Sequence, residues 1–92
     1  MGREFLREKS QLFLCLEDLQ NKVEFCVAKG MDDEFSHFYN AVLDWKNAVE
    51  YASSTSELVS ILNQAQSLEH NLDSWMSRHG LETLSLNWPK LT

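Results

Sequence analysis

The chain has 92 residues, a net charge of −6 and 43% apolar residues, which fits one small domain with a modest core. One proline and three glycines provide few chain breaks, which argues against a many-stranded β fold. No apolar run exceeds five residues, too short for a membrane span. The acidic balance disfavours nucleic acid and anionic membranes as direct partners.

The first helix is predicted over residues 3–29. Apolar residues recur in it at alternating intervals of four and three, which defines one apolar seam along the helix: Leu12, Leu16, Leu19, Val23 and Cys26. Gly30 is a natural residue to end this helix, because glycine readily adopts the left-handed conformation found there. Phe13, Leu14 and Phe25 lie off the seam, so a core built on that seam does not account for them.

Cys15 and Cys26 lie on this same predicted helix, roughly 16 Å apart along its axis. They cannot form a disulfide with each other while the helix is intact. The absence of a disulfide framework predicts small buried thiols and a reducing, cytoplasmic location.

Two further helices are predicted over residues 32–52 and 55–79. Asp32 is expected to cap the former, and Ser54 with Glu57 forms a capping box for the latter. His79 and Gly80 are expected to end the third helix. Both helices repeat the three–four spacing, the former in Phe35, Phe38, Val42, Trp45, Val49 and Ala52, the latter in Leu58, Ile61, Ala65, Leu68, Leu72 and Trp75.

Residues 81–92 differ, because Leu84, Leu86 and Trp88 alternate with polar residues and Pro89 follows. This pattern predicts an extended tail that lies along a groove of the bundle or on a partner. Short connections favour antiparallel neighbours. The predicted fold is therefore all-α: an antiparallel up-down-up three-helix bundle over residues 1–80, with an extended apolar tail over residues 81–92.

The sequence contains only weak matches to catalytic and metal-binding motifs. Glu34 and His37 have the Glu-x-x-His spacing of carboxylate-bridged metal sites, but the required second copy of the motif is absent. His70 and Asp73 are three residues apart on one predicted helix, yet no nucleophile is recognisably placed beside them. We predict no catalytic residues, no metal site and no cofactor.

The surplus apolar residues instead predict a non-catalytic interaction protein, such as a small acidic adaptor, chaperone or inhibitor, that binds a protein partner or a second copy of itself. Its predicted contact residues lie on the first helix and on the tail: Phe13, Leu14, Phe25, Leu86 and Trp88. Trp88 has two open interpretations, packing on its own bundle or anchoring a partner.

The alternative is an acidic inhibitor of a nucleic-acid-binding protein, because residues 32–73 contain eight acidic residues and a single base, Lys46. The predicted acidic surface comprises Asp32, Asp33, Glu34, Asp44, Glu50, Glu57, Glu69 and Asp73. A more remote alternative is a helical metalloenzyme that uses Glu34, His37 and His70.

Overall fold

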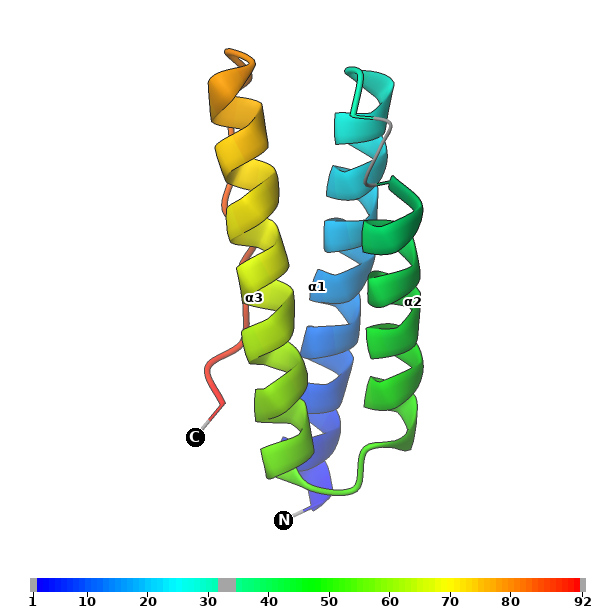
Figure 1. Ribbon diagram of the computed structural model, residues 1–92. Coiled ribbons are helices and arrows are strands. Elements are labelled where there is room, and N and C mark those ends of the chain that lie inside the picture. The colour runs from blue at the N-terminus through cyan, green and yellow to red at the C-terminus, as the bar shows by residue number, and fades with distance from the viewer. Residues whose placement is uncertain (1, 32–34, 92) are drawn as a thin grey trace.

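The computed structural model describes residues 2–31 and 35–91, and these form three helices followed by an extended tail. Helix α1 (Gly2–Ala28), helix α2 (Phe35–Tyr51) and helix α3 (Thr55–Arg78) alternate in direction (Figure 1). The bundle measures 44 × 22 × 16 Å. The predicted all-α, antiparallel three-helix bundle is confirmed. Within residues 2–31 and 35–91, every helix is too short or too polar to span a lipid bilayer.

The core lies where the three predicted seams meet. All five seam residues of α1, from Leu12 to Cys26, are fully buried. Val42 and Val49 of α2 and Leu58 and Leu72 of α3 are buried with them. The heptad spacing therefore identified the inward face of each helix, because residues three and four apart share one side of a helix.

Both long helices end in the same way. Gly30 and Gly80 have φ angles of 113° and 69°, a conformation that side chains disfavour and glycine adopts freely. After α1 the Met31 amide donates to the Cys26 carbonyl, and after α3 the Leu81 amide donates to the Met76 carbonyl. These are Schellman motifs, so both glycines end their helices as predicted.

The start of α3 also follows the prediction. The Ser54 side chain accepts a hydrogen bond from the Glu57 amide at 3.3 Å, and the Glu57 carboxylate accepts one from the Ser53 amide at 3.2 Å. At the other end, Nδ1 of His79 lies 2.8 Å from the Trp75 carbonyl. The predicted cap at Asp32 lies outside the described residues.

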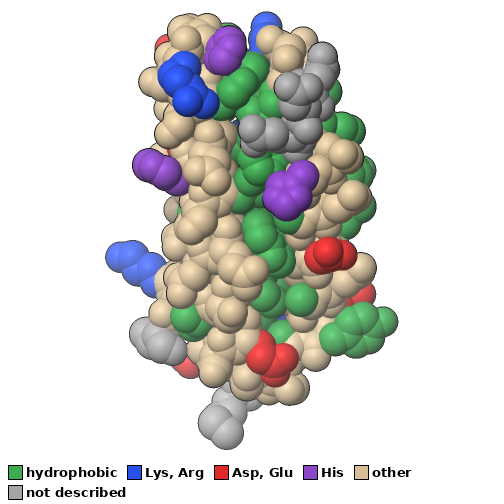
Figure 2. Space-filling view, viewed as in Figure 1, with side chains coloured by type: hydrophobic (Ala, Val, Ile, Leu, Met, Phe, Trp, Pro, Cys, Tyr) green, Lys and Arg blue, Asp and Glu red, His purple; other side chains and the backbone are tan. Residues whose placement is uncertain are grey.

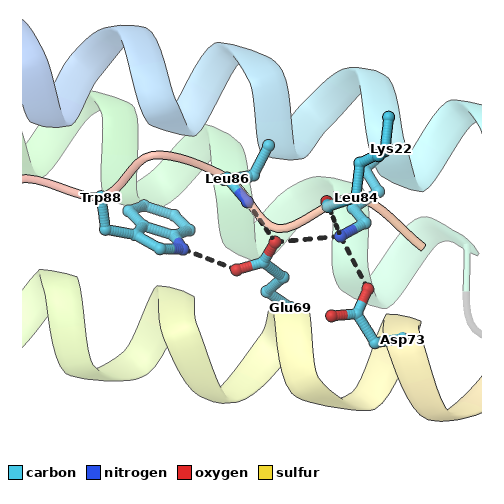
Figure 3. Close-up of polar contacts among 6 residues, drawn as sticks. All are labelled: Lys22, Glu69, Asp73, Leu84, Leu86 and Trp88. Carbon is cyan, nitrogen blue, oxygen red and sulfur yellow. Dashed lines mark hydrogen bonds and ion pairs between the residues drawn. The ribbon is translucent and has the colours of Figure 1, made fainter.

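The tail runs back along the bundle from the end of α3, between α3 and α1 (Figures 1 and 3). Leu86 and Trp88 are half-buried and pack against the core, as do Leu81 and Leu91. Leu84 is 78% exposed, so the predicted alternation holds for Leu86 and Trp88 but not for Leu84.

The opposite side of α3 faces α2. Figure 2 shows a band of apolar side chains along the line where these two helices meet, flanked by polar side chains and backbone. Trp45 of α2 is half-buried and its Nε1 donates to Oε1 of Gln64 on α3 at 3.3 Å. The tail and α2 thus lie on different sides of α3. Among the described residues, none covers the outward face of α1, which carries Leu6, Ser10 and Leu14.

Candidate functional site

A connected group of polar contacts surrounds Glu69, and we call it the Glu69 cluster: Lys22, Glu69, Asp73, Leu84, Leu86 and Trp88 (Figure 3). Glu69 projects from α3 toward the tail. Its Oε1 accepts a hydrogen bond from Nε1 of Trp88 at 2.6 Å, and its Oε2 accepts one from the Leu86 amide at 2.9 Å. One carboxylate therefore holds two points of the tail.

Lys22 joins the Glu69 carboxylate to α1, the other helix that lies beside the tail. Its Nζ donates to Oε2 of Glu69 at 2.9 Å and to the Leu84 carbonyl at 2.9 Å. Oδ1 of Asp73 lies 2.6 Å from the same Nζ but without hydrogen-bond geometry, so this contact acts as an ion pair. The cluster thus links α1, α3 and the tail.

The environment keeps both central groups charged. Burial opposes ionisation of Glu69, but hydrogen bonds from Trp88, Lys22 and Leu86 outweigh it and hold the pKa of the carboxyl below its ordinary value. Burial likewise disfavours the charged form of Lys22, yet contacts with Asp73 and Glu69 raise the pKa of its ammonium. The Lys22 and Glu69 side chains are only 8% and 10% exposed, so their charges depend on each other.

The sequence interpretation placed Glu69 on an exposed acidic surface, and that placement is wrong. Glu69 is buried because the tail and Lys22 cover it. A signal existed in the spacing: Glu69 and Asp73 lie four residues apart, each next to a core leucine. Lys22 lies next to Val23 on the facing helix. Charges that flank a seam are well placed to pair across it.

The rest of the predicted acidic surface is not gathered into one site. Glu57 caps α3, and Asp73 pairs with Lys22 rather than with His70. Asp44 and Glu50 are exposed on α2. The remaining three acidic residues of the prediction, Asp32, Asp33 and Glu34, lie outside the described residues.

The predicted contact residues of the tail serve the molecule's own packing. The Trp88 indole N–H and the Leu86 backbone N–H each donate a hydrogen bond to the Glu69 carboxylate. The Asn87 carbonyl between them accepts from Sγ of Cys15 at 3.2 Å. Of the two interpretations of Trp88, the geometry favours packing on its own bundle.

The predicted contact residues of α1 lie elsewhere. Leu14 is 59% exposed, whereas Phe13 is half-buried under Nζ of Lys46, which lies 5.1 Å from its ring centroid. Leu6, which the sequence interpretation missed, is 60% exposed. An open groove of about 650 Å³ lies between α1 and α2, lined by Leu6, Lys9, Ser10, Phe13, Leu14, Val49 and Glu50.

Phe25 belongs to a different surface, nearer the far end of α1. It is 43% exposed and lines a shallow depression with Leu84 and Leu86 of the tail. Lys22 and Asp18 lie at the same depression. The structure therefore separates Phe25 from the groove that holds Phe13 and Leu14.

No metal centre is assembled in the part of the chain that the structure describes. His37 and His70 are exposed on different helices, and no group of three His, Cys, Asp or Glu side chains converges there. Glu34, the third predicted ligand, lies outside the described residues. Both cysteines are buried, and burial raises the pKa of each thiol, which makes them poor nucleophiles at neutral pH.

No protein family, no characterised protein and no solved structure matches this chain.

Proposed function

We propose that the protein is a non-catalytic interaction protein that binds another polypeptide through the outward face of α1. The observation that supports this proposal is the exposure of Leu6 and Leu14 at 60% and 59%, on either side of the groove that Phe13 lines. Apolar groups gathered at one place on a small protein are typical of an interaction surface.

The position of the tail supports the choice of α1 over the tail as the contact surface. Trp88 and Leu86 are held by Glu69, so a partner that used them would first have to break the Glu69 cluster. Within residues 2–31 and 35–91, Leu14 and Leu6 make no such contact, so their use by a partner requires no rearrangement there. The tail then acts as an internal brace that fixes α1 against α3.

The acidic-inhibitor alternative receives no comparable support. Two of the predicted acidic residues, Glu69 and Asp73, are paired with Lys22, and Glu57 is used in capping. Among the predicted acidic residues that the structure describes, only Asp44 and Glu50 remain exposed without such a role. A steep salt dependence of partner binding would be needed to favour this alternative.

Site-specific photocrosslinking in the native cell tests the proposal. A benzophenone amino acid replaces Leu14 in one variant and the exposed His70 of α3 in a matched control variant. We expect crosslinked products at position 14 that position 70 does not give, and mass spectrometry of those products identifies the polypeptide bound. Identical products from the two positions, or none from position 14, would contradict the proposal.

A further inference from the structure

We infer that the polypeptide bound by the outward face of α1 is a second copy of this chain, paired antiparallel through α1 with Ser10 at the twofold axis. This inference rests on the proposed interaction role of α1 and adds the identity and geometry of the partner. The exposed residues of the helix support it through their charge and their symmetry about Ser10.

The charges of the outward face run from positive to negative along α1. Arg3 and Arg7 are exposed near its beginning, and Glu17 and Glu24 are exposed further along. An antiparallel copy reverses this order, so that the basic beginning of each helix lies beside the acidic Glu17 of the other. A parallel copy would instead place like charges together, which is unfavourable.

The apolar residues have the same symmetry. Leu6 and Leu14 lie four residues before and after Ser10, about 6 Å along the axis in each direction and within about 40° of its angular position. In the antiparallel pair, Leu14 of each chain therefore meets Leu6 of the other. The small side chain of Ser10 lies at the centre, where it allows the two helices to approach closely.

The charged residues Arg3 and Glu17 have the same symmetry about Ser10, so they can form ion pairs between the two chains. Arg3 and Glu17 lie seven residues before and after Ser10, about 10 Å along the axis. Arg3 of each chain therefore faces Glu17 of the other. Glu17 already pairs at 3.6 Å with Lys46 of its own chain, but its side chain is 47% exposed and can be reached by a second base.

Lys9 and the tail, which lie beside the outward face of α1, are directed away from it. Nζ of Lys9 donates to the carbonyls of Glu50 and Ala52 at 3.0 and 3.1 Å, so this base is directed toward the end of α2. The tail contacts α1 on its other flank, at Cys15 and Lys22. An isologous pair is the commonest closed arrangement of identical chains, and its contact residues occur twice.

Sedimentation equilibrium of the purified full chain tests the inference. At about 1 mM chain, half of the chains are paired even in a dimer with a Kd of about 1 mM, so the expected weight-average mass is at least about 1.5 times the 10.7 kDa of one chain. Leu14→Asp is expected to raise the Kd by at least about tenfold, because each dimer loses two Leu–Leu contacts. Leu43→Asp, on α2 and outside the groove, is the matched control and leaves the Kd unchanged.

A charge exchange tests the register. Arg3→Glu and Glu17→Arg each create like-charge contacts and are expected to remain monomeric when studied alone. An equal mixture of the two variants restores both ion pairs of the mixed dimer and is expected to associate. Circular dichroism of each variant checks that the helices are retained.

Three results would overturn the inference: a monomeric wild-type mass at this concentration, association unaffected by Leu14→Asp, or a mixture no more associated than its components. A monomeric mass combined with a crosslink from position 14 to a different protein would discard self-pairing and leave the proposed function in place. Failure of both experiments would discard both.

Discussion

Lys22 supplies one positive charge between two carboxylates of α3. Its ammonium lies within 3 Å of two carboxylates, those of Glu69 and Asp73, and is 8% exposed. Removing one carboxylate leaves the ammonium a second partner, whereas removing the ammonium leaves two nearby negative charges without compensation. Removing the Lys22 ammonium is therefore expected to lower the free energy of unfolding more than removing one of the two carboxylates.

Lys22→Met is accordingly expected to lower the free energy of unfolding by about 3–5 kcal/mol, as for other buried charges that lose their partner. Glu69→Gln keeps the shape and one acceptor, and its expected cost is smaller, about 1–3 kcal/mol. Urea denaturation of the two variants measures this order, with Lys29→Met at an exposed lysine as control, where a change within about 0.5 kcal/mol is expected. Equal costs for Lys22→Met and Lys29→Met would show that the cluster contributes nothing to stability.

The position of the tail depends on a few specific contacts. It has no regular hydrogen-bonded structure of its own between residues 81 and 91. Three of its contacts fall on consecutive residues from Leu86 to Trp88, and the Asn87 carbonyl covers the thiol of Cys15. Exposure of Cys15 therefore reports whether the tail is in place.

Trp88→Phe removes the indole donor and keeps an aromatic ring. We expect it to accelerate the reaction of Cys15 with a small disulfide reagent at least about tenfold, since a hydrogen bond to a charged acceptor contributes roughly 1.5–3 kcal/mol. The measurement is made in a Cys26→Ala background, so that only one thiol reacts. Trp45→Phe, whose indole bonds to Gln64 away from the tail, is the control, and an equal acceleration in both variants would show that the tail is not the cause.

The stability of the folded molecule depends on pH through the ionisation of the Glu69 cluster. The pKa of Glu69 is lower in the folded chain than its ordinary value, so its contribution to stability is complete above that ordinary value and is lost as the pH falls below it. The pKa of Lys22 is raised, so its contribution is complete below its ordinary value and is lost only in strong alkali. Both contributions are present at neutral pH.

Acidification is therefore expected to destabilise the wild-type chain more than Glu69→Gln. The difference should develop below the ordinary glutamate pKa of about 4.3, because only the wild type has this carboxylate to protonate. Urea denaturation at a series of pH values from 7 to acid measures it, with the remaining acidic residues common to both proteins. Parallel stability curves for the two proteins would contradict the assigned role of Glu69.

The spacing of apolar residues was sufficient to predict the helices and their inward faces. Spacing in a helix is a local property, so the seam from Leu12 to Cys26, the stop at Gly30 and the cap at Ser54 followed from positions alone. The same spacing set Phe13, Leu14 and Phe25 apart from the seam. It did not reveal that Leu6 shares their exposure, or that Phe25 belongs to another surface.

The burial of Glu69 could not be predicted from spacing. Periodicity gives the angle of a residue around its own helix, but burial depends on what covers that angle. Glu69 is covered by Lys22, 47 residues earlier, and by Trp88, 19 residues later. These three residues come from α1, α3 and an irregular tail whose path has no period. Their meeting is fixed by packing of the whole chain, because a buried carboxylate is stable only where donors from other segments reach it.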